Sequence, residues 1–353
     1  MIYRESGQFA SSYAKDMRMF PLLQDRWAFG ALLVFAFVVI PLIANDYWLS
    51  SILTLFLIYS LSAIGLNILT GFCGQLSLGH AAFMAVGAYA SYNFAVRLHT
   101  PVLVNFLLAG FVAAAVGLLF GLPSLRIKGF YLAVATLAAQ FTIEWVLVSF
   151  NWFAGGSMLG AIDTPPMNIM GWDVSSNLDK YLLTLSVVVV LAIVAKNLGR
   201  SEVGRSWRAI RDLDVAAEIM GIRLFPYKLL AFMVSSFYAG VAGALYAFCY
   251  LGSLEVTAFE LAVSFRLLGM IIIGGLGTIL GSFLGAGFIV LLPILISQAI
   301  VFLHISGASD FLANAELMIF GGLIILFLIV EPYGLARMWQ TIKEKLRLWP
   351  FPY

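Results

Sequence analysis

The sequence predicts an all-α polytopic membrane protein with about ten transmembrane helices, or eight to ten if the short, glycine-rich ones are broken or re-entrant. Of its 353 residues, 62% are hydrophobic and only 11% are charged, whereas soluble domains are about one-quarter charged. A soluble core cannot use so much apolar residue, because too little polar surface would remain to cover it. The mean hydropathy of +0.99 therefore indicates many spans of about 20 apolar residues each.

Ten apolar runs are candidates for these spans. The run after Arg26 is expected to be a retained first span, because the first 27 residues are too polar for a signal peptide. We expect a cytoplasmic amphipathic segment at 1–27, a transmembrane domain at 28–335 and a basic cytoplasmic tail at 336–353. The ten runs lie at roughly 28–44, 48–69, 76–95, 102–121, 130–149, 180–196, 226–249, 260–279, 282–303 and 315–331.

Lysine and arginine predict the orientation of the chain. Of the 20 basic residues, 17 fall in regions that ten crossings place on one side of the membrane, including seven between Lys196 and Lys228. The other side holds only Arg97 and Lys180, next to an acidic loop at 151–179. The positive-inside rule therefore predicts that both termini and the loop at 197–225 are cytoplasmic.

One apolar stretch carries residues that a lipid-facing helix does not need. Leu69–Ser91 reads LTGFCGQLSLGHAAFMAVGAYAS. Small residues let helices approach closely, but glycines with polar neighbours also let the backbone unwind. Unwound backbone at membrane depth is tolerated only inside protein or along a water-filled cavity. We therefore expect this segment to face a translocation path or a protein interface. Its candidate residues are Gly71, Gly74, Gln75, Ser77, Gly79 and His80.

A similar glycine spacing returns in the second half of the chain, at Gly274, Gly275 and Gly277. This weak internal repeat, with glycine-interrupted helices, is typical of transporters, whose substrate route lies at the interface between repeats. Tight helix packing through glycine remains the other explanation. Thr136 and Gln140 are further polar candidates for a translocation path.

Two charged residues, Glu144 and Arg266, lie within apolar runs. A charge at membrane depth costs about 2.5–3.5 kcal/mol on insertion scales and is by default a candidate for function. Three explanations stay open: a structural ion pair or interface residue, a contact in the translocation path, and a proton relay. A histidine that, like His80, is alone in its run is more often a hydrogen-bonded packing residue than a substrate ligand.

The stretch Ser201–Gly221 predicts one short amphipathic helix between two spans. Ser201 is a suitable N-cap, Gly221 ends the helix, and Pro226 opens the next span. Apolar residues recur every three or four positions and form one stripe. The stripe has three possible uses: lying in the lipid interface, belonging to a solvated connector, or docking into a groove of a cytoplasmic partner. Its members are Trp207, Ile210, Leu213, Ala217 and Met220.

Several blocks of the chain together resemble a known family. Ala216–Gly221 reads AAEIMG and precedes Pro226, an order that resembles the EAA-type loop of bacterial ABC importer permeases. Four blocks, in the right order and spread over most of residues 50–330, are similar to the permease of the branched-chain amino acid ABC importer, the LivM-type subunit. These blocks are Gly71–Ser91, Leu125–Ala138, Gly204–Ala247 and Ile271–Ala286.

This resemblance implies an ABC importer permease fold and a permease subunit that moves branched-chain or other hydrophobic amino acids across the bacterial inner membrane by alternating access. It also implies two cytoplasmic ABC ATPases, a sister permease forming a heterodimer, and an extracytoplasmic substrate-binding protein as partners. The loop helix would be the coupling helix that contacts an ATPase. Its expected contact residues are Arg205, Trp207, Arg208, Ile210, Arg211, Leu213, Ala217, Glu218, Met220 and Gly221.

ATP is expected to bind the partner subunits, because the sequence contains no Gly-x-x-x-x-Gly-Lys-Ser/Thr phosphate loop. We expect no cofactor, metal site or catalytic residue, and the net charge of +2 gives no reason to expect a nucleic acid. Membrane lipid is the remaining partner. Three alternatives stay open: uptake of urea, short amides or aromatic acids within the same family, an ATP-independent secondary transporter or channel, and a non-transporting scaffold.

Overall fold

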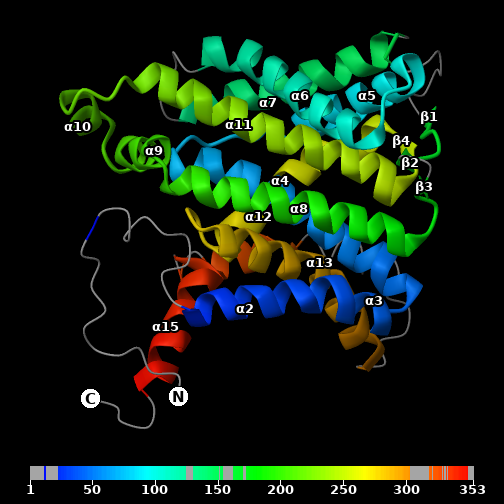
Figure 1. Ribbon diagram of the computed structural model, residues 1–353. Helices are drawn as coiled ribbons and strands as arrows, with labels where there is room; N and C mark the ends of the chain where they lie inside the picture. Colours follow the sequence, from blue (N-terminus) through cyan, green and yellow to red (C-terminus); the bar gives the residue numbers. More distant parts are fainter. Residues whose placement is uncertain are drawn as a thin grey trace.

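The computed structural model describes residues 12, 23–124, 130–150, 152–153, 162–169, 172–302, 318–319, 321–327, 329, 331 and 333–348. Within these residues the chain is a bundle of long helices that run side by side (Figure 1). Most of the segment expected at 1–27 lies outside the described residues, as do Arg126, Lys128 and parts of the span expected at 315–331.

The long helices match the expected spans closely. The first is α2 (Leu23–Val34), which continues through the π-helical turn η1 (Phe35–Val39) into α3 (Ile40–Ile43). The second is η2 (Trp48–Leu53), α4 (Thr54–Asn67) and η3 (Ile68–Phe72). The others are α5 (His80–Leu98), α6 (Val102–Ser124), α7 (Phe130–Ser149), α8 (Asn177–Arg200), α11 (Leu224–Leu245) with η4 (Tyr246–Leu251), α12 (Leu261–Gly274) after the short 3₁₀ helix η5 (Val256–Phe259), and α13 (Ile279–Phe302).

Eight helices of the described chain are long and apolar enough to cross a membrane. The expected span at 76–95 corresponds to α5, which begins only at His80 because residues 73–79 are not helical. Although α5 is 19 residues long, it is not among the eight. Most of it is buried inside the bundle, so alanine, glycine and asparagine suffice where a lipid-facing helix needs larger apolar residues.

Close approach of helices explains the many small residues. Helix α11 packs most extensively against α6 and α5. A Cβ added at Gly243 would lie 1.9 Å from the carbonyl oxygen of Met84, and one added at Gly87 would lie 2.1 Å from that of Gly240. Because lipid gives helices no hydrophobic reason to associate, such backbone contact supplies the packing energy. Glycines at the centre of the bundle therefore allow α11 and α5 to pack in backbone contact.

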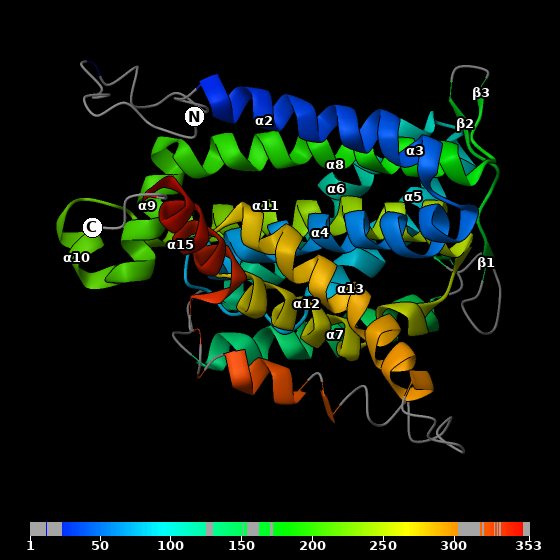
Figure 2. The same ribbon diagram turned by 90° about the horizontal axis from the view of Figure 1, so that it is seen from below.

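The two ends of the bundle differ. At one end lie α9 (Glu202–Asp212), α10 (Asp214–Ile219), α15 (Gly334–Leu348) and the first turn of α2 (Figures 1 and 2). At the other end lie four short strands, β1 (Ile162–Asp163), β2 (Asn168–Ile169), β3 (Trp172–Asp173) and β4 (Ser253–Leu254), in which β1 pairs with β4 and β2 with β3, both antiparallel. The basic loop and the described part of the basic tail thus share one end.

Candidate functional site

The expected unwinding near Gly74 is present. The helix that begins at Trp48 ends at Phe72, and residues 73–79 are not helical before α5 starts. Gly74 adopts a φ of 71°, which an L side chain rarely takes. The amide of Gly74 donates to Thr70 and that of Gln75 to Leu69, both at 3.1 Å. We call residues 73–79 the first break.

Side chains from neighbouring helices accept hydrogen bonds from backbone amides at the end of the first break and in the first turn of α5. The amide of Leu78 donates to Thr136 Oγ1, that of Ala81 to Ser264 Oγ and that of Ala82 to Gln140 Oε1, each at 2.9 Å. The first turn of any helix has amides without an intrahelical acceptor, and inside the bundle no bulk water replaces them. Helices α7 and α12 therefore cap α5.

Gln140 is the centre of this capping group. It is fully buried. Its Nε2 donates to Glu144 Oε1 at 2.6 Å and to the Phe259 carbonyl at 2.8 Å, and its Oε1 also accepts from Ser264 at 3.3 Å. A Cβ at Gly79 would lie 2.1 Å from the Thr136 carbonyl. The structure thus brings the expected path residues Gly79, Thr136, Gln140 and Glu144 together, and uses their polar atoms for internal hydrogen bonds.

Replacing Gln140 by leucine is expected to lower the stability of the chain by about 2 kcal/mol or more, because it leaves the Ala82 amide and the Phe259 carbonyl buried without partners. Thermal denaturation in detergent measures the effect. The control is Thr142→Val on the same helix: Thr142 is exposed and bonds only its own helix, at Ala138, so its change is expected within about 0.5 kcal/mol. Equal melting of both variants would contradict the capping role.

Gln75 and Ser77 differ from their neighbours. Both are buried, and in the described part of the chain the side-chain amide of Gln75 and the hydroxyl of Ser77 have no hydrogen-bond partner. Buried polar groups are normally paired, so these two retain unused bonding capacity within the first break. His80, by contrast, pairs through Nε2 with the carbonyl of Ser62 at 3.1 Å, which is the packing role that remained open for it.

The second glycine segment also breaks a helix, and it lies against the helix end that precedes the first break. Helix α12 ends at Gly274 and α13 begins at Ile279, with Gly275 and Gly277 at φ values of 119° and 77°. We call residues 275–278 the second break. Asn67, before the first break, donates to the Thr278 carbonyl and accepts from the Gly277 amide, both at 2.8 Å. Asn67 therefore connects the helix end before the first break to the second break, and the predicted internal repeat stays a prediction.

The expectation of one helix over 201–221 is wrong. Ser201 does cap α9, accepting from Gly204 at 3.4 Å, and Gly221, at a φ of 88°, follows the end of α10. Between them Leu213 is extended, with φ −159° and ψ 102°, so the loop contains two helices. A periodicity count cannot detect one extended residue, because Leu213 still falls at the expected spacing.

The apolar stripe is divided between two faces. Trp207, Ile210 and Ala217 are buried, and Trp207 Nε1 donates to the Tyr227 carbonyl at 2.8 Å. These residues anchor the loop to the bundle and are not available for a partner. Leu213 and Met220 are 62% and 68% exposed. With two residues outside the expected stripe they form what we call the loop patch: Leu213, Val215, Ile219 and Met220.

The charged residues of the loop have separate positions. Arg208 donates to the Gly199 carbonyl, Lys228 lies 3.9 Å from Asp214, and Arg205 and Glu218 are exposed. Arg211 donates to Gly71 within the bundle.

Of the two charges expected at membrane depth, Glu144 accepts a hydrogen bond from Gln140. Arg266 is half-buried.

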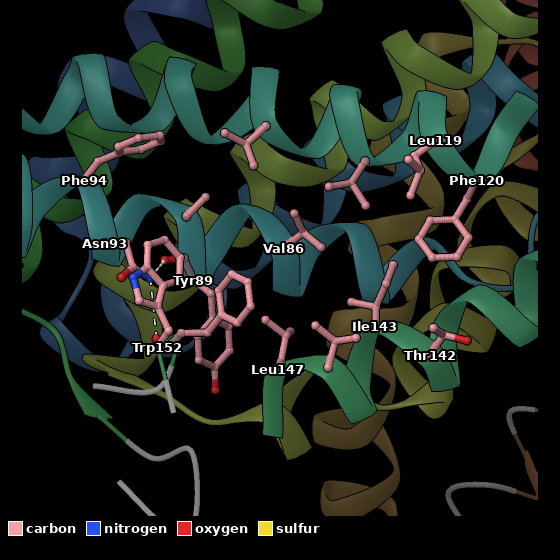
Figure 3. Close-up of a pocket in the computed structure, with 15 residues that line it drawn as sticks. Val86, Tyr89, Asn93, Phe94, Leu119, Phe120, Thr142, Ile143, Leu147 and Trp152 are labelled. Carbon is pink, nitrogen blue, oxygen red and sulfur yellow. Dashed lines mark hydrogen bonds between the residues drawn. The ribbon is translucent and has the colours of Figure 1, made fainter. Parts of the chain in front are cut away.

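A pocket of ≈ 410 Å³ lies between α5, α6 and α7. Asn93, Tyr89 and Trp152 lie toward one end of it and Leu119, Phe120 and Thr142 toward the other (Figure 3). The 15 residues that line it include no charged side chain and none of the expected path residues. The ammonium and carboxylate groups of an amino acid would find no ionic partner there, so the pocket is separate from the candidate site.

Comparison with known proteins agrees with this architecture. Residues 48–328 match the family described as branched-chain amino acid transport system / permease component. The chain belongs to this family. It is 32% identical over 312 residues to the high-affinity branched-chain amino acid transport system permease protein LivM of Salmonella typhimurium and, to the same extent, of Escherichia coli; the matches cover 81% of this chain and 69% of each relative.

A more distant relative is the autoinducer 2 import system permease protein LsrC of Yersinia pestis, 27% identical over 237 residues, which cover 63% of this chain and 58% of the relative. No solved structure matches the chain significantly. The permease is thus a multi-pass membrane transport component of the ABC type.

Sequence reasoning missed four residues of the permease site. Asn67 and Ser264 act from outside the glycine segments, and only the packing of α4, α12 and α13 brings them there. Val215 and Ile219 belong to the loop patch. Val215 and Ile219 are four residues apart, a helical spacing that could have identified them as one apolar face. The apolar stripe through Trp207 is longer and is the stronger signal in the sequence.

Proposed function

We propose that this permease is the transmembrane subunit of an ATP-driven ABC importer that moves branched-chain or other hydrophobic amino acids inward by alternating access. One structural observation supports this proposal in addition to the membership of the family. The loop, which carries an exposed apolar patch, is bonded through Arg211 to Gly71, in the helical turn just before the first break. A secondary transporter or channel has no use for such a connection.

The proposed assembly contains two cytoplasmic ABC ATPases, a sister permease and an extracytoplasmic substrate-binding protein. ATP would bind the ATPases. Coupling requires a structural element with two conformations, whose relative populations change both when ATP binds and when substrate binds. We assign that role to the loop and the two breaks, because glycine breaks change direction at low cost. This assignment places both termini and the loop in the cytoplasm, in keeping with the distribution of lysine and arginine.

Gln75 and Ser77 are the proposed polar contacts of the translocation path. They are the residues of the first break whose buried side chains have no partner in the described chain. A hydrophobic amino acid needs few strong polar contacts on its route, since strong ones would trap it. The amino acid substrate is inferred from the LivM relatives, which are named for high-affinity branched-chain amino acid transport. The LsrC relative is named for the import of autoinducer 2, so the test of function compares the uptake of several substrates.

The test is reconstitution of the permease with co-expressed candidate ATPases, a sister permease and the binding protein in vesicles. We expect the ATPases to co-purify and radiolabelled leucine to accumulate only with ATP and binding protein, whereas a non-hydrolysable ATP analogue gives no accumulation. Urea, acetamide and benzoate are the comparison substrates. Uptake by the permease alone, independent of ATP, would establish a secondary transporter or channel and overturn the proposal.

A further inference from the structure

Arg211, in the last turn of α9, turns its side chain toward the bundle. Its Nη1 donates to the carbonyl oxygen of Gly71 at 2.9 Å. Gly71 lies within the last helical turn before the first break, where carbonyls lose their intrahelical donors. A guanidinium is a strong donor for such a carbonyl, because its hydrogen bonds are charge-assisted. Arg211 therefore connects the loop to the start of the first break.

The same side chain touches glycines of both breaks. A Cβ added at Gly74 would lie 3.0 Å from Arg211 Cγ and 3.2 Å from its Cα. A Cβ added at Gly277 would lie 3.0 Å from Arg211 Nη1. Gly74 and Gly277, which are far apart in the chain, therefore both leave space that the Arg211 side chain occupies. Since both glycines have positive φ, a side chain at either would strain the backbone and press on Arg211.

Two neighbours hold this arrangement. Arg211 Nε and Nη2 donate to Asp212 Oδ1 at 2.9 and 2.8 Å, which directs the remaining nitrogen, Nη1, at Gly71. Asn67, at the end of α4, holds the second break against this helix through Gly277 and Thr278. The arginine has its donors in a fixed planar fork, so its guanidinium lies between the loop, the helix end at Gly71 and Gly277 of the second break.

We propose that Arg211 is a positioning residue that ties α9 to both glycine breaks, so that displacement of the loop moves the two breaks together. The inference rests on the proposed function for its role in transport, and it differs from the expectation that Arg211 contacts an ATPase. The polar side of its guanidinium is directed to Asp212 and Gly71, within its own chain.

The two native cysteines provide a direct test. Cys73 lies in the first break beside Gly74, and Cys249 lies in η4; both are free and buried. In membranes containing the full assembly, Arg211→Ala is expected to raise maleimide labelling of Cys73 about tenfold, with Cys249 unchanged. Arg211→Lys, which keeps one donor, is expected to give a smaller rise. Arg223→Ala, an exposed arginine of the same loop, is the matched control.

Labelling of Cys73 at the unsubstituted rate in Arg211→Ala would overturn the proposal. A parallel rise at Cys249 would also overturn it, because that result shows general loosening of the bundle. This readout does not require transport. It therefore tests the connection even if ATP fails to drive uptake by the unsubstituted assembly, a failure that would count against the proposed function alone.

Transport supplies the second readout. In reconstituted vesicles, Arg211→Ala is expected to keep its ATPases and their hydrolysis but to lower substrate accumulated per ATP about tenfold. Arg211→Lys is expected to restore part of the ratio, and Arg223→Ala to keep it. Loss of the ATPases from the Arg211→Ala assembly would show that Arg211 is a docking contact and would overturn the positioning role.

Discussion

Gly243→Leu is expected to abolish recovery of the folded chain from membranes. A Cβ at this position would lie 1.9 Å from the backbone oxygen and 2.5 Å from the carbonyl carbon of Met84. These atoms belong to helix α5 and cannot rotate away, so α5 and α11 must separate. Because α11 also packs on α6 and α4, the separation spreads through the centre of the bundle. We expect a loss of about 3 kcal/mol or more.

The matched control is Gly30→Leu, the same substitution in the first span. Among the described residues, no atom of another helix and no side chain beyond its chain neighbours lies within 4 Å of a Cβ added at Gly30, so this variant is expected to fold like the unsubstituted chain. Size-exclusion chromatography of fluorescently tagged chains in mild detergent measures the folded fraction of each. A monodisperse Gly243→Leu peak with unchanged melting would mean that α5 and α11 are not in backbone contact.

The second large effect is expected at the loop patch. Ile219 is 81% exposed at the end of the bundle that carries the basic loop. Exposed apolar patches rimmed by charge mark protein interfaces, and a few such residues carry most of the binding energy. Ile219→Asp together with Met220→Asp is therefore expected to weaken ATPase binding about 100-fold and to remove ATP-driven uptake.

Co-purification of the ATPases at graded salt and detergent measures this loss, with leucine uptake as the second readout. The control is Ile219→Val, which stays apolar and is expected to bind within about threefold of the unsubstituted chain. Full retention of the ATPases by the double aspartate variant would exclude the patch as the docking surface. It would leave the lipid interface as its environment.

The spans were predictable because hydropathy is a property of each segment by itself. The bounds of α6 and α7 agree with the expected runs at 102–121 and 130–149 within a few residues. Helix α5 shows the limit of this reasoning. Its start depends on side chains of α7 and α12 that cap its first amides, and no local count of apolar residues contains that information. The break at Leu213 was missed for a similar reason.

The candidate site was predicted in its residue types and not in its arrangement. Glycine beside Gln75 and Ser77 identified the first break, and Gly274–Gly277 the second, because glycine and buried polar groups are costly in a lipid-facing helix. The contact of Asn67 with the second break, and the hydrogen bond from Arg211 to Gly71, join segments more than 100 residues apart in the chain.

The many membrane crossings and the positions of the glycine breaks were readable in the amino-acid sequence, because both are local properties set by the cost of placing polar or charged groups in lipid. The permease family was readable from the order of similar blocks along the chain. Which half of the amphipathic loop is buried depends on tertiary packing, because Trp207 and Ile219 have equal hydrophobic reason to leave water. Only the packing of the loop against the bundle satisfies the Trp207 indole and leaves Ile219 exposed.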